Sequence, residues 1–211
     1  MNTAAALMSV VCLLLAPTFA LPQEVKQRTF PSFAASKDQP KEAASDYPLQ
    51  WDPSKVTWNV SLEGYGQSCP MILGEKVIVT SVVGPNKEVC KVTCLDFKSG
   101  KFVWERKIES SFPVESTPMV SRAAPTPVGD LNGVYIFFES GDLVAFDLEG
   151  NLRWQRCLQK DLSPFENKFG LSSTPVQTEQ RLFLLIDHAG ESSLLSVDKG
   201  TGKNEWIAAR G

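Results

Sequence analysis

The chain holds few residues whose type and spacing could support catalysis. Its only histidine, His188, follows Asp187 in a segment typical of a hairpin turn, and an aspartate can orient an imidazole for general acid–base catalysis. No nucleophile is placed beside this pair, because Ser192 and Ser193 are ordinary turn serines. We therefore expect a solvated turn at His188 and assign no catalytic residue.

Two carboxylates lie close together in a second expected turn, Glu139-Ser140-Gly141-Asp142. Calcium needs about six or more oxygen ligands, so this pair predicts a polar hairpin tip instead of a metal site. The sequence has no Cys-x-x-Cys pair and no cluster of cysteine and histidine, the usual ligand set of zinc. We therefore expect no metal and no cofactor.

The cysteines point to packing and not to chemistry. Cys90 and Cys94 lie in an alternating, strand-like segment, where four residues span about 13 Å, too far for a disulfide between them. The main expectation for Cys69, Cys90, Cys94 and Cys157 is that they are small buried thiols. A bridge from Cys69 to Cys90 or Cys94 is the alternative, which export would permit.

Composition and charge indicate a folded chain without a nucleic-acid partner. The 211 residues are 43% hydrophobic and carry a formal net charge of −3, which suits one ordinary domain with a real core. No run of lysine and arginine stands out, so neither nucleic acid nor an anionic membrane surface is an expected partner.

The N-terminal part differs from the rest of the chain. Residues 1–20 predict a signal peptide cleaved after Ala20, because residues 4–16 are almost wholly apolar and small residues follow them. An uncleaved anchor is the alternative. Residues 21–48 contain several prolines and few large apolar side chains, and they predict a disordered linker. The expected location is periplasmic or secreted.

An internal repeat dominates residues 49–211. The pattern Asp-x-x-(Ser/Thr)-Gly-Lys-x-x-Trp occupies residues 96–104 and 198–206, and a copy one residue shorter occupies residues 147–154. Trp58 ends an earlier, partial copy, and a proline precedes the apolar strand of each unit by the same distance. Two markers that keep the same phase predict a repeat architecture. The motif residues are Asp96, Gly100, Trp104, Asp147, Gly150, Trp154, Asp198, Gly202 and Trp206.

Each unit predicts four short strands. The first starts at the proline, the second is a continuous apolar run such as residues 134–138, the third precedes the aspartate, and the fourth ends in the tryptophan. Continuous hydrophobicity indicates strands covered on both faces, and four-stranded units of about 40–50 residues are typical of propeller blades. The tryptophans are therefore expected to pack between blades, in preference to stacking on a ligand.

The predicted fold class is all-β, a partial β-propeller of about three four-stranded blades. The blades are expected at about residues 59–104, 105–154 and 155–206. Propellers typically have about four to eight blades, so we expect a truncated propeller. Such a chain would expose an apolar blade face and would tend to self-associate.

The repeat resembles the tryptophan-docking motif of quinoprotein dehydrogenases, Ala-x-Asp-x-x-Thr-Gly-Lys-x-x-Trp, carried here by residues 94–104, 145–154 and 196–206. Residues 169–175 and 194–199 are also similar to bacterial pyrroloquinoline quinone (PQQ)-like propellers of unassigned function. The resemblance implies a propeller fold with a structural role for the motif. The dehydrogenases hold calcium and stack PQQ on an adjacent Cys-Cys disulfide, and this sequence has no such pair.

Two function classes follow. The favoured one is an exported, non-catalytic PQQ-like propeller that binds an unknown protein partner or acts as a scaffold. The alternative is a fragment of a PQQ-dependent oxidoreductase whose quinone and calcium site lies in further blades. The lack of an adjacent cysteine pair and of a metal ligand set in the sequence favours the first class.

Overall fold

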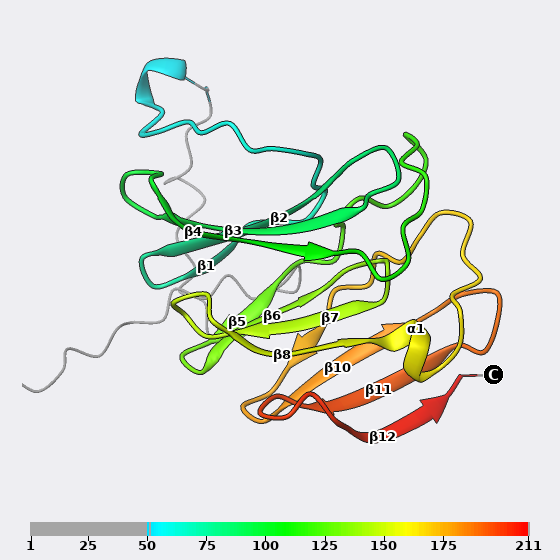
Figure 1. The fold of residues 1–211 in the computed structure, drawn as a ribbon. Coiled ribbons are helices and arrows are strands. Elements are labelled where there is room, and N and C mark those ends of the chain that lie inside the picture. The colour runs from blue at the N-terminus through cyan, green and yellow to red at the C-terminus, as the bar shows by residue number, and fades with distance from the viewer. Residues whose placement is uncertain (1–49, 51, 211) are drawn as a thin grey trace, which may run out of the picture.

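The computed structural model describes residue 50 and residues 52–210, and these residues are almost entirely antiparallel β-sheet (Figure 1). The predicted signal peptide (1–20) and linker (21–48) lie outside the described residues. Within the described part, no helix has the length and hydrophobicity to cross a membrane.

Twelve strands form three four-stranded sheets, and the strands of each sheet neighbour one another in chain order. A short 3-10 helix at Pro53–Lys55 and helix α1 at Leu158–Asp161 complete the regular elements of the described residues. The first sheet comprises β1 (Met71–Leu73), β2 (Lys76–Val83), β3 (Val89–Asp96) and β4 (Phe102–Glu109). The second comprises β5 (Val128–Asp130), β6 (Gly133–Phe137), β7 (Asp142–Phe146) and β8 (Leu152–Cys157). The third comprises β9 (Val176–Gln177), β10 (Arg181–Ile186), β11 (Ser193–Asp198) and β12 (Asn204–Ala209).

The first strand of each sheet begins directly after the proline of its repeat, as the sequence predicts. Strands β1, β5 and β9 start at the residues that follow Pro70, Pro127 and Pro175. Proline is tolerated at a strand start, because its missing N–H removes no hydrogen bond from the ladder there. The apolar runs form β2, β6 and β10, each hydrogen-bonded on both sides.

The fourth strands do not end at their tryptophans, so that prediction was wrong. Strand β4 continues past Trp104 to Glu109, and β8 and β12 likewise continue beyond Trp154 and Trp206. Just before each tryptophan the register with the third strand shifts, which marks a β-bulge. A bulge bends its strand and re-aims the next side chain. The tryptophan is therefore the third residue of the outer strand, and the expected blade ends fall short of the sheet ends.

The three sheets stack face to face as blades (Figure 1). Their short first strands approach one another, β1 beside β5 and β5 beside β9. One core cluster lies between the first and second sheets and includes Ile78, Val92, Ile136 and Phe146. A second core cluster lies between the second and third sheets and joins side chains of β6 and β7 to those of β10 and β11. The partial propeller of three four-stranded blades is thus confirmed.

The blades are also joined at their inner edge. The backbone N–H of Cys69 donates to Oγ1 of Thr126 at 3.2 Å, and the N–H of Thr126 donates to Oγ1 of Thr174 at 3.0 Å. These three residues stand immediately before the three repeat prolines. The proline marker in the sequence therefore coincides with a hydrogen bond that passes from blade to blade.

All four cysteines of the described residues are free thiols, so the alternative of a Cys69 bridge is not realised. Cys90, Cys94 and Cys157 are buried as expected, but Cys69 is exposed. Its position before Pro70 lies at the inner edge of the first blade, which has no preceding blade within the described residues. Burial raises the pKa of Cys90 to about 12 and that of Cys94 to about 11.

Alkylation under native conditions should therefore discriminate among these thiols. Iodoacetamide at pH 8 is expected to modify Cys69 and to leave Cys90 and Cys94 unmodified, because only the thiolate reacts and both buried thiols stay protonated. Peptide mass spectrometry measures each site, and denatured protein is the control in which all react. Native labelling of Cys90, or a Cys69 that reacts only after reduction, would contradict this assignment.

Candidate functional site

The repeat motif folds into a tight turn between the third and fourth strands of each blade. In the first and third blades the motif aspartate accepts hydrogen bonds from the backbone N–H three residues later, Ser99 N to Asp96 at 2.8 Å and Thr201 N to Asp198 at 2.8 Å. In the second blade Asp147 accepts the backbone N–H of Asn151 at 2.7 Å. We call residues 96–100, 147–150 and 198–202 the docking turns.

The motif aspartates are partly buried, and their hydrogen bonds favour the charged form. Side-chain hydrogen bonds from a serine, an asparagine and a threonine, followed by backbone N–H donors, lower the pKa of Asp96, Asp147 and Asp198 below the usual range. The carboxylates thus stabilise the turns by accepting their backbone N–H groups, which is a structural role.

Each docking turn receives the tryptophan of the preceding repeat. The indole N–H donates to the carbonyl of the residue that follows the motif aspartate in the next blade. The contacts are Trp58 Nε1 to Phe97 O at 2.9 Å, Trp104 Nε1 to Leu148 O at 3.0 Å, and Trp154 Nε1 to Lys199 O at 2.9 Å.

The motif glycines are required by this contact as well as by the turn. Gly100, Gly150 and Gly202 have φ of 68°, 80° and 71°, a region that favours glycine. A Cβ at these positions would also lie only 2.6–2.7 Å from the docked indole. The motif therefore places a glycine, which has no side chain, where the indole of the preceding tryptophan packs.

An arginine reinforces two of the three contacts, and the sequence analysis missed it. Arg106 Nε donates to Gly150 O at 2.6 Å, and Arg156 Nη1 donates to Gly202 O at 2.6 Å. Both arginines stand two residues after a docked tryptophan. A Trp-x-Arg pattern at residues 104–106 and 154–156 was the available signal, because side chains two apart on a strand share a face.

The turn predicted as a polar hairpin tip is instead buried between the first and second blades. Glu139 pairs with Lys87 at 3.3 Å, and Lys87 Nζ also donates to Ser121 O at 2.9 Å. Asp142 accepts the N–H of Ser111 at 2.9 Å. Only the tertiary structure brings Lys87, from the loop between β2 and β3, to this turn.

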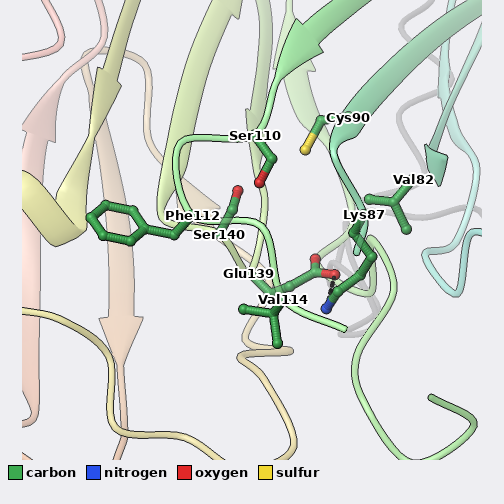
Figure 2. A pocket seen from close by; sticks show the side chains of 8 residues that line it. All are labelled: Val82, Lys87, Cys90, Ser110, Phe112, Val114, Glu139 and Ser140. Carbon is green, nitrogen blue, oxygen red and sulfur yellow. Dashed lines mark hydrogen bonds and ion pairs between the residues drawn. The ribbon is translucent and has the colours of Figure 1, made fainter. Parts of the chain in front are cut away.

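Lys87 and Glu139 border a small hollow, shown in Figure 2, with about 210 Å³ of empty space including open solvent. Lys87 and Glu139 point toward each other there, and the Cys90 thiol lies on the first-blade side. Burial raises the pKa of Glu139 and the Lys87 ammonium opposes that rise. The Lys87 ammonium and the Glu139 carboxylate neutralise each other. This ion pair connects the two blades, and neither group is free to act in catalysis.

A second ion pair joins the second and third blades. Lys199 is buried, and its ammonium pairs with Asp130 and donates to Gln177 Oε1 at 3.0 Å. The same ammonium lies 5.0 Å from the ring centroid of Tyr135. Lysine occupies the turn position whose carbonyl receives Trp154, so one residue makes two contacts between blades.

His188 is partly buried, and its hydrogen bonds organise loops. Its Nδ1 accepts the backbone N–H groups of Glu166 and Gly190, each at 3.1 Å. The Ser192 hydroxyl bonds to Asp187 and to the His188 backbone instead of to the imidazole ring. The geometry of a nucleophile activated by histidine is therefore not formed. No three His, Cys, Asp or Glu side chains gather as metal ligands among residues 50 and 52–210.

One face of the third blade carries a row of four cross-strand neighbours, and the two residues at its ends are exposed and apolar. The cross-strand neighbours Val176, Phe183, Ser196 and Trp206 form this row, which we call the open docking row. The first-blade counterparts are Met71, Ile78, Cys94 and Trp104, and the second-blade counterparts are Val128, Tyr135, Ala145 and Trp154.

Those counterparts pack against the next blade, whereas the described residues contain no further blade beside the open docking row. Trp104 is 8% exposed and Val128 is 5% exposed, but Trp206 is 41% exposed and Val176 is 58% exposed. Exposed apolar patches of this kind mark interaction sites. The open docking row is therefore the candidate functional site of the described residues.

The docked and undocked tryptophans provide a direct test of the repeat contact. Replacing Trp104 by alanine should cost about 3–5 kcal/mol of unfolding free energy, because it removes a buried aromatic ring and leaves a cavity. Urea denaturation of dilute protein measures this loss. The matched control is Trp206→Ala, expected to cost less than about 1 kcal/mol since its indole has no docking turn. Equal losses in the two variants would refute the docking role.

The lowered aspartate pKa values predict a dependence of stability on pH. The unfolded carboxyl has a pKa of about 3.9, so stabilisation by Asp198 is complete above that value and is lost as the pH falls through the lower folded pKa. Urea denaturation at pH 7 and pH 3 should show a smaller loss on acidification for Asp198→Asn than for the unchanged chain. Glu191→Gln, at an exposed carboxylate outside the docking turns, is the control. An unaltered pH dependence in Asp198→Asn would contradict the role of this turn.

Solved structures of quinohemoprotein alcohol dehydrogenases share the fold of this chain. Quinohemoprotein alcohol dehydrogenase from Comamonas testosteroni aligns with a TM-score of 0.50 at 13% identity, over 69% of this chain and 21% of that chain. A quinohemoprotein alcohol dehydrogenase from Pseudomonas putida HK5 aligns with a TM-score of 0.52 at 17% identity, over 71% and 21%. BamB from Moraxella catarrhalis aligns with a TM-score of 0.48 at 20% identity, over 72% and 39%.

The aligned region thus corresponds to 21–39% of the length of these structures. The similarity to the dehydrogenases shows the fold alone. No curated protein matched the chain. A protein-family model does match, over residues 47–211, and it is described as outer membrane protein assembly factor BamB. Since this match includes every blade, the chain belongs to the PQQ-like propeller family of outer membrane protein assembly factor BamB.

Proposed function

We propose that this chain is an exported, non-catalytic scaffold module that binds protein through the open docking row of its third blade. The observation that carries the proposal is the exposure of Val176 and Trp206, whose counterparts in the other blades are packed against a neighbouring sheet. The family description, an assembly factor for outer membrane proteins, agrees with a role in protein binding.

The chemistry of the open docking row suits a protein surface. The Trp206 indole, whose N–H has no acceptor among residues 50 and 52–210, is flanked by the Phe183 ring at 6.0 Å between centroids. It combines apolar area with one directional hydrogen bond. Tryptophan is enriched among the residues that dominate protein–protein affinity for this reason. A small ligand would need a concave site, whereas the row crosses the four neighbouring strands of one sheet.

Export of the chain is supported by the predicted signal peptide at residues 1–20 and by the family description, an assembly factor for outer membrane proteins. We therefore propose the periplasm as its location. A periplasmic scaffold would meet its protein partners outside the cytoplasm, where folding intermediates of exported proteins expose apolar surface.

A fragment of a PQQ-dependent oxidoreductase is the second candidate, favoured by the structural similarity to quinohemoprotein dehydrogenases. The described residues do not fit PQQ and calcium. The nearest cysteine pair, Cys90 and Cys94, is not adjacent, and the motif aspartates are engaged by docking-turn N–H groups. We derive no catalytic step for this chain.

Site-specific crosslinking in its native cells tests the proposed function. A photo-crosslinking amino acid in place of Val176 should give a discrete protein adduct, because the row would face its partner. The same substitution at Leu131, which is also exposed but lies in the turn between β5 and β6, is the control. The adduct at residue 176 should disappear in Trp206→Ser.

The two candidate functions differ in a second measurement. Purified chain supplied with PQQ, calcium and alcohols should reduce no redox dye under the scaffold proposal. Dye reduction that needs PQQ, combined with no protein adduct at residue 176, would overturn the scaffold proposal in favour of the oxidoreductase.

A further inference from the structure

We propose that the outer edge of strand β12 accepts an extended, uncharged segment of another polypeptide, which pairs with it as an additional strand of the third blade. The inference rests on the proposed function, because it names the form in which a protein binds beside the open docking row. It is carried by a difference between β12 and the outer strands of the other two blades, β4 and β8.

Strand β12 has backbone groups that point away from its sheet. It lies at the outer margin of the third sheet (Figure 1) and, within the described residues, pairs only with β11. The backbone N–H of Arg210 donates to Ser192 O at 2.8 Å, and partners in antiparallel strands alternate between hydrogen-bonded and non-hydrogen-bonded pairs. Ala208 therefore bonds to β11, whereas the N–H and C=O groups of Ile207 and Ala209 point outward.

The outer edges of the first two blades are protected at the equivalent positions. By the same alternation, the outward backbone groups of β4 belong to Glu105, Lys107 and Glu109. Strand β8 presents Gln155 in this way and then continues into helix α1. Charged side chains, lysine above all, keep an edge strand from pairing with another chain. Strand β12 lacks this protection, since residues 206–209 are Trp-Ile-Ala-Ala.

The apolar stretch of β12 is bounded by charges that are already paired. Glu205 pairs with Arg181, and Arg210 pairs with Asp187. Residues 206–209 themselves carry no charge, so a charged side chain on an added strand would gain no ion pair with them. We therefore expect an uncharged partner segment.

An added strand would continue the open docking row across the edge of the sheet. Trp206 is the outermost residue of the row and is 41% exposed, and a neighbouring side chain of the partner would lie on the same face. On the opposite face the partner would lie beside Ile207, which is 48% exposed although its cross-strand neighbour Leu195 is buried. Apolar side chains on both faces of the partner would cover these two residues, while its main chain bonds to Ile207 and Ala209.

A blade that follows the third one would leave this edge open. The second and third blades pack on the faces of the blades before them, and β4 and β8 are nevertheless the last strands of their sheets. The outward backbone groups of Ile207 and Ala209 are therefore accessible to a partner strand even when another blade covers the adjacent face.

Fluorescence anisotropy on the full chain, with a dye-labelled peptide of alternating valine and threonine, tests the proposal. Such a peptide has no charged side chain, and its β-branched residues favour a strand. The unchanged chain should bind it. Ala209→Pro should weaken the binding by about tenfold or more, because proline removes an outward N–H and obstructs pairing on that side.

The N–H of Ala209 makes no bond to β11, so Ala209→Pro should keep nearly the thermal stability of the unchanged chain. Ala209→Ser, which alters the side chain and retains the N–H, is the matched control and should bind the peptide like the unchanged chain. Leu131→Pro is not a suitable control, because it changes a turn; Leu131→Ser reports on an exposed apolar residue away from β12 and should also bind normally.

Amide hydrogen exchange, followed residue by residue by NMR, identifies the contact without any variant. With the peptide bound, the N–H groups of Ile207 and Ala209 should exchange about tenfold more slowly or less, since they would then be hydrogen-bonded. The N–H of Ala208 is bonded to β11 in the free chain and should change little. Protection confined to side-chain contacts on the row would leave all three amides unaltered.

No binding of the peptide, equal binding by Ala209→Pro and the unchanged chain, or unaltered exchange at Ile207 and Ala209 would each overturn the proposed strand pairing. Dimers of the unchanged chain that Ala209→Pro converts to monomers, measured by sedimentation velocity, would identify a second copy as the occupant and would overturn it too.

The outcome is separable from that of the proposed function. If residue 176 gives a Trp206-dependent adduct in cells but the peptide leaves the β12 amides unaltered, the scaffold function stands and the strand pairing is wrong. Slower exchange at Ile207 and Ala209 without a cellular adduct would support the strand pairing and contradict the scaffold function.

Discussion

The contact of an indole with the glycine of the following blade is the interaction on which the rest of this structure depends. A four-stranded sheet with apolar side chains on both faces cannot be stable alone, because it must cover both faces. The tryptophan meets this need at the outer edge, where the blades diverge. Its ring lies on a glycine that has no Cβ to obstruct it, and its N–H satisfies a carbonyl of the turn.

Other contacts also connect neighbouring blades, both at the inner edge and in the middle of each junction. Threonine hydroxyls accept backbone N–H groups where the first strands approach one another. Apolar clusters fill the middle of each junction, and the buried pairs of Lys87 with Glu139 and Lys199 with Asp130 add charge-assisted bonds. Breaking a buried pair of this kind leaves an uncompensated charge, so these pairs favour one relative placement of neighbouring blades.

The open docking row follows from the same construction. Every blade presents a tryptophan row on one face and a docking turn on the other, so a stack of blades has two unlike ends. In the described residues Trp58 covers the turn at one end, while the row at the other end is exposed. A surface built to bind a sheet is thereby available to another protein, and the fold itself supplies the candidate site.

The sequence determined the blades, because the markers of the repeat are local. Each docking turn is specified by an aspartate and a glycine a few residues apart, and each first strand by the proline before it. These elements depend on backbone geometry and short-range hydrogen bonds, which a single segment of chain contains. The period of the tryptophans then indicated that the units pack on one another.

Tertiary structure alone decided which surfaces are covered. The apolar run of β10 predicts burial on both faces, yet its side chains alternate between buried and more exposed, while β6 is buried throughout. Likewise, Glu139 and Asp142 form the polar turn expected from the sequence but lie between blades, against Lys87 and Ser111. Coverage depends on segments distant in the chain, and the free energy of burying a side chain is set by its neighbours in space. No local pattern contains that information.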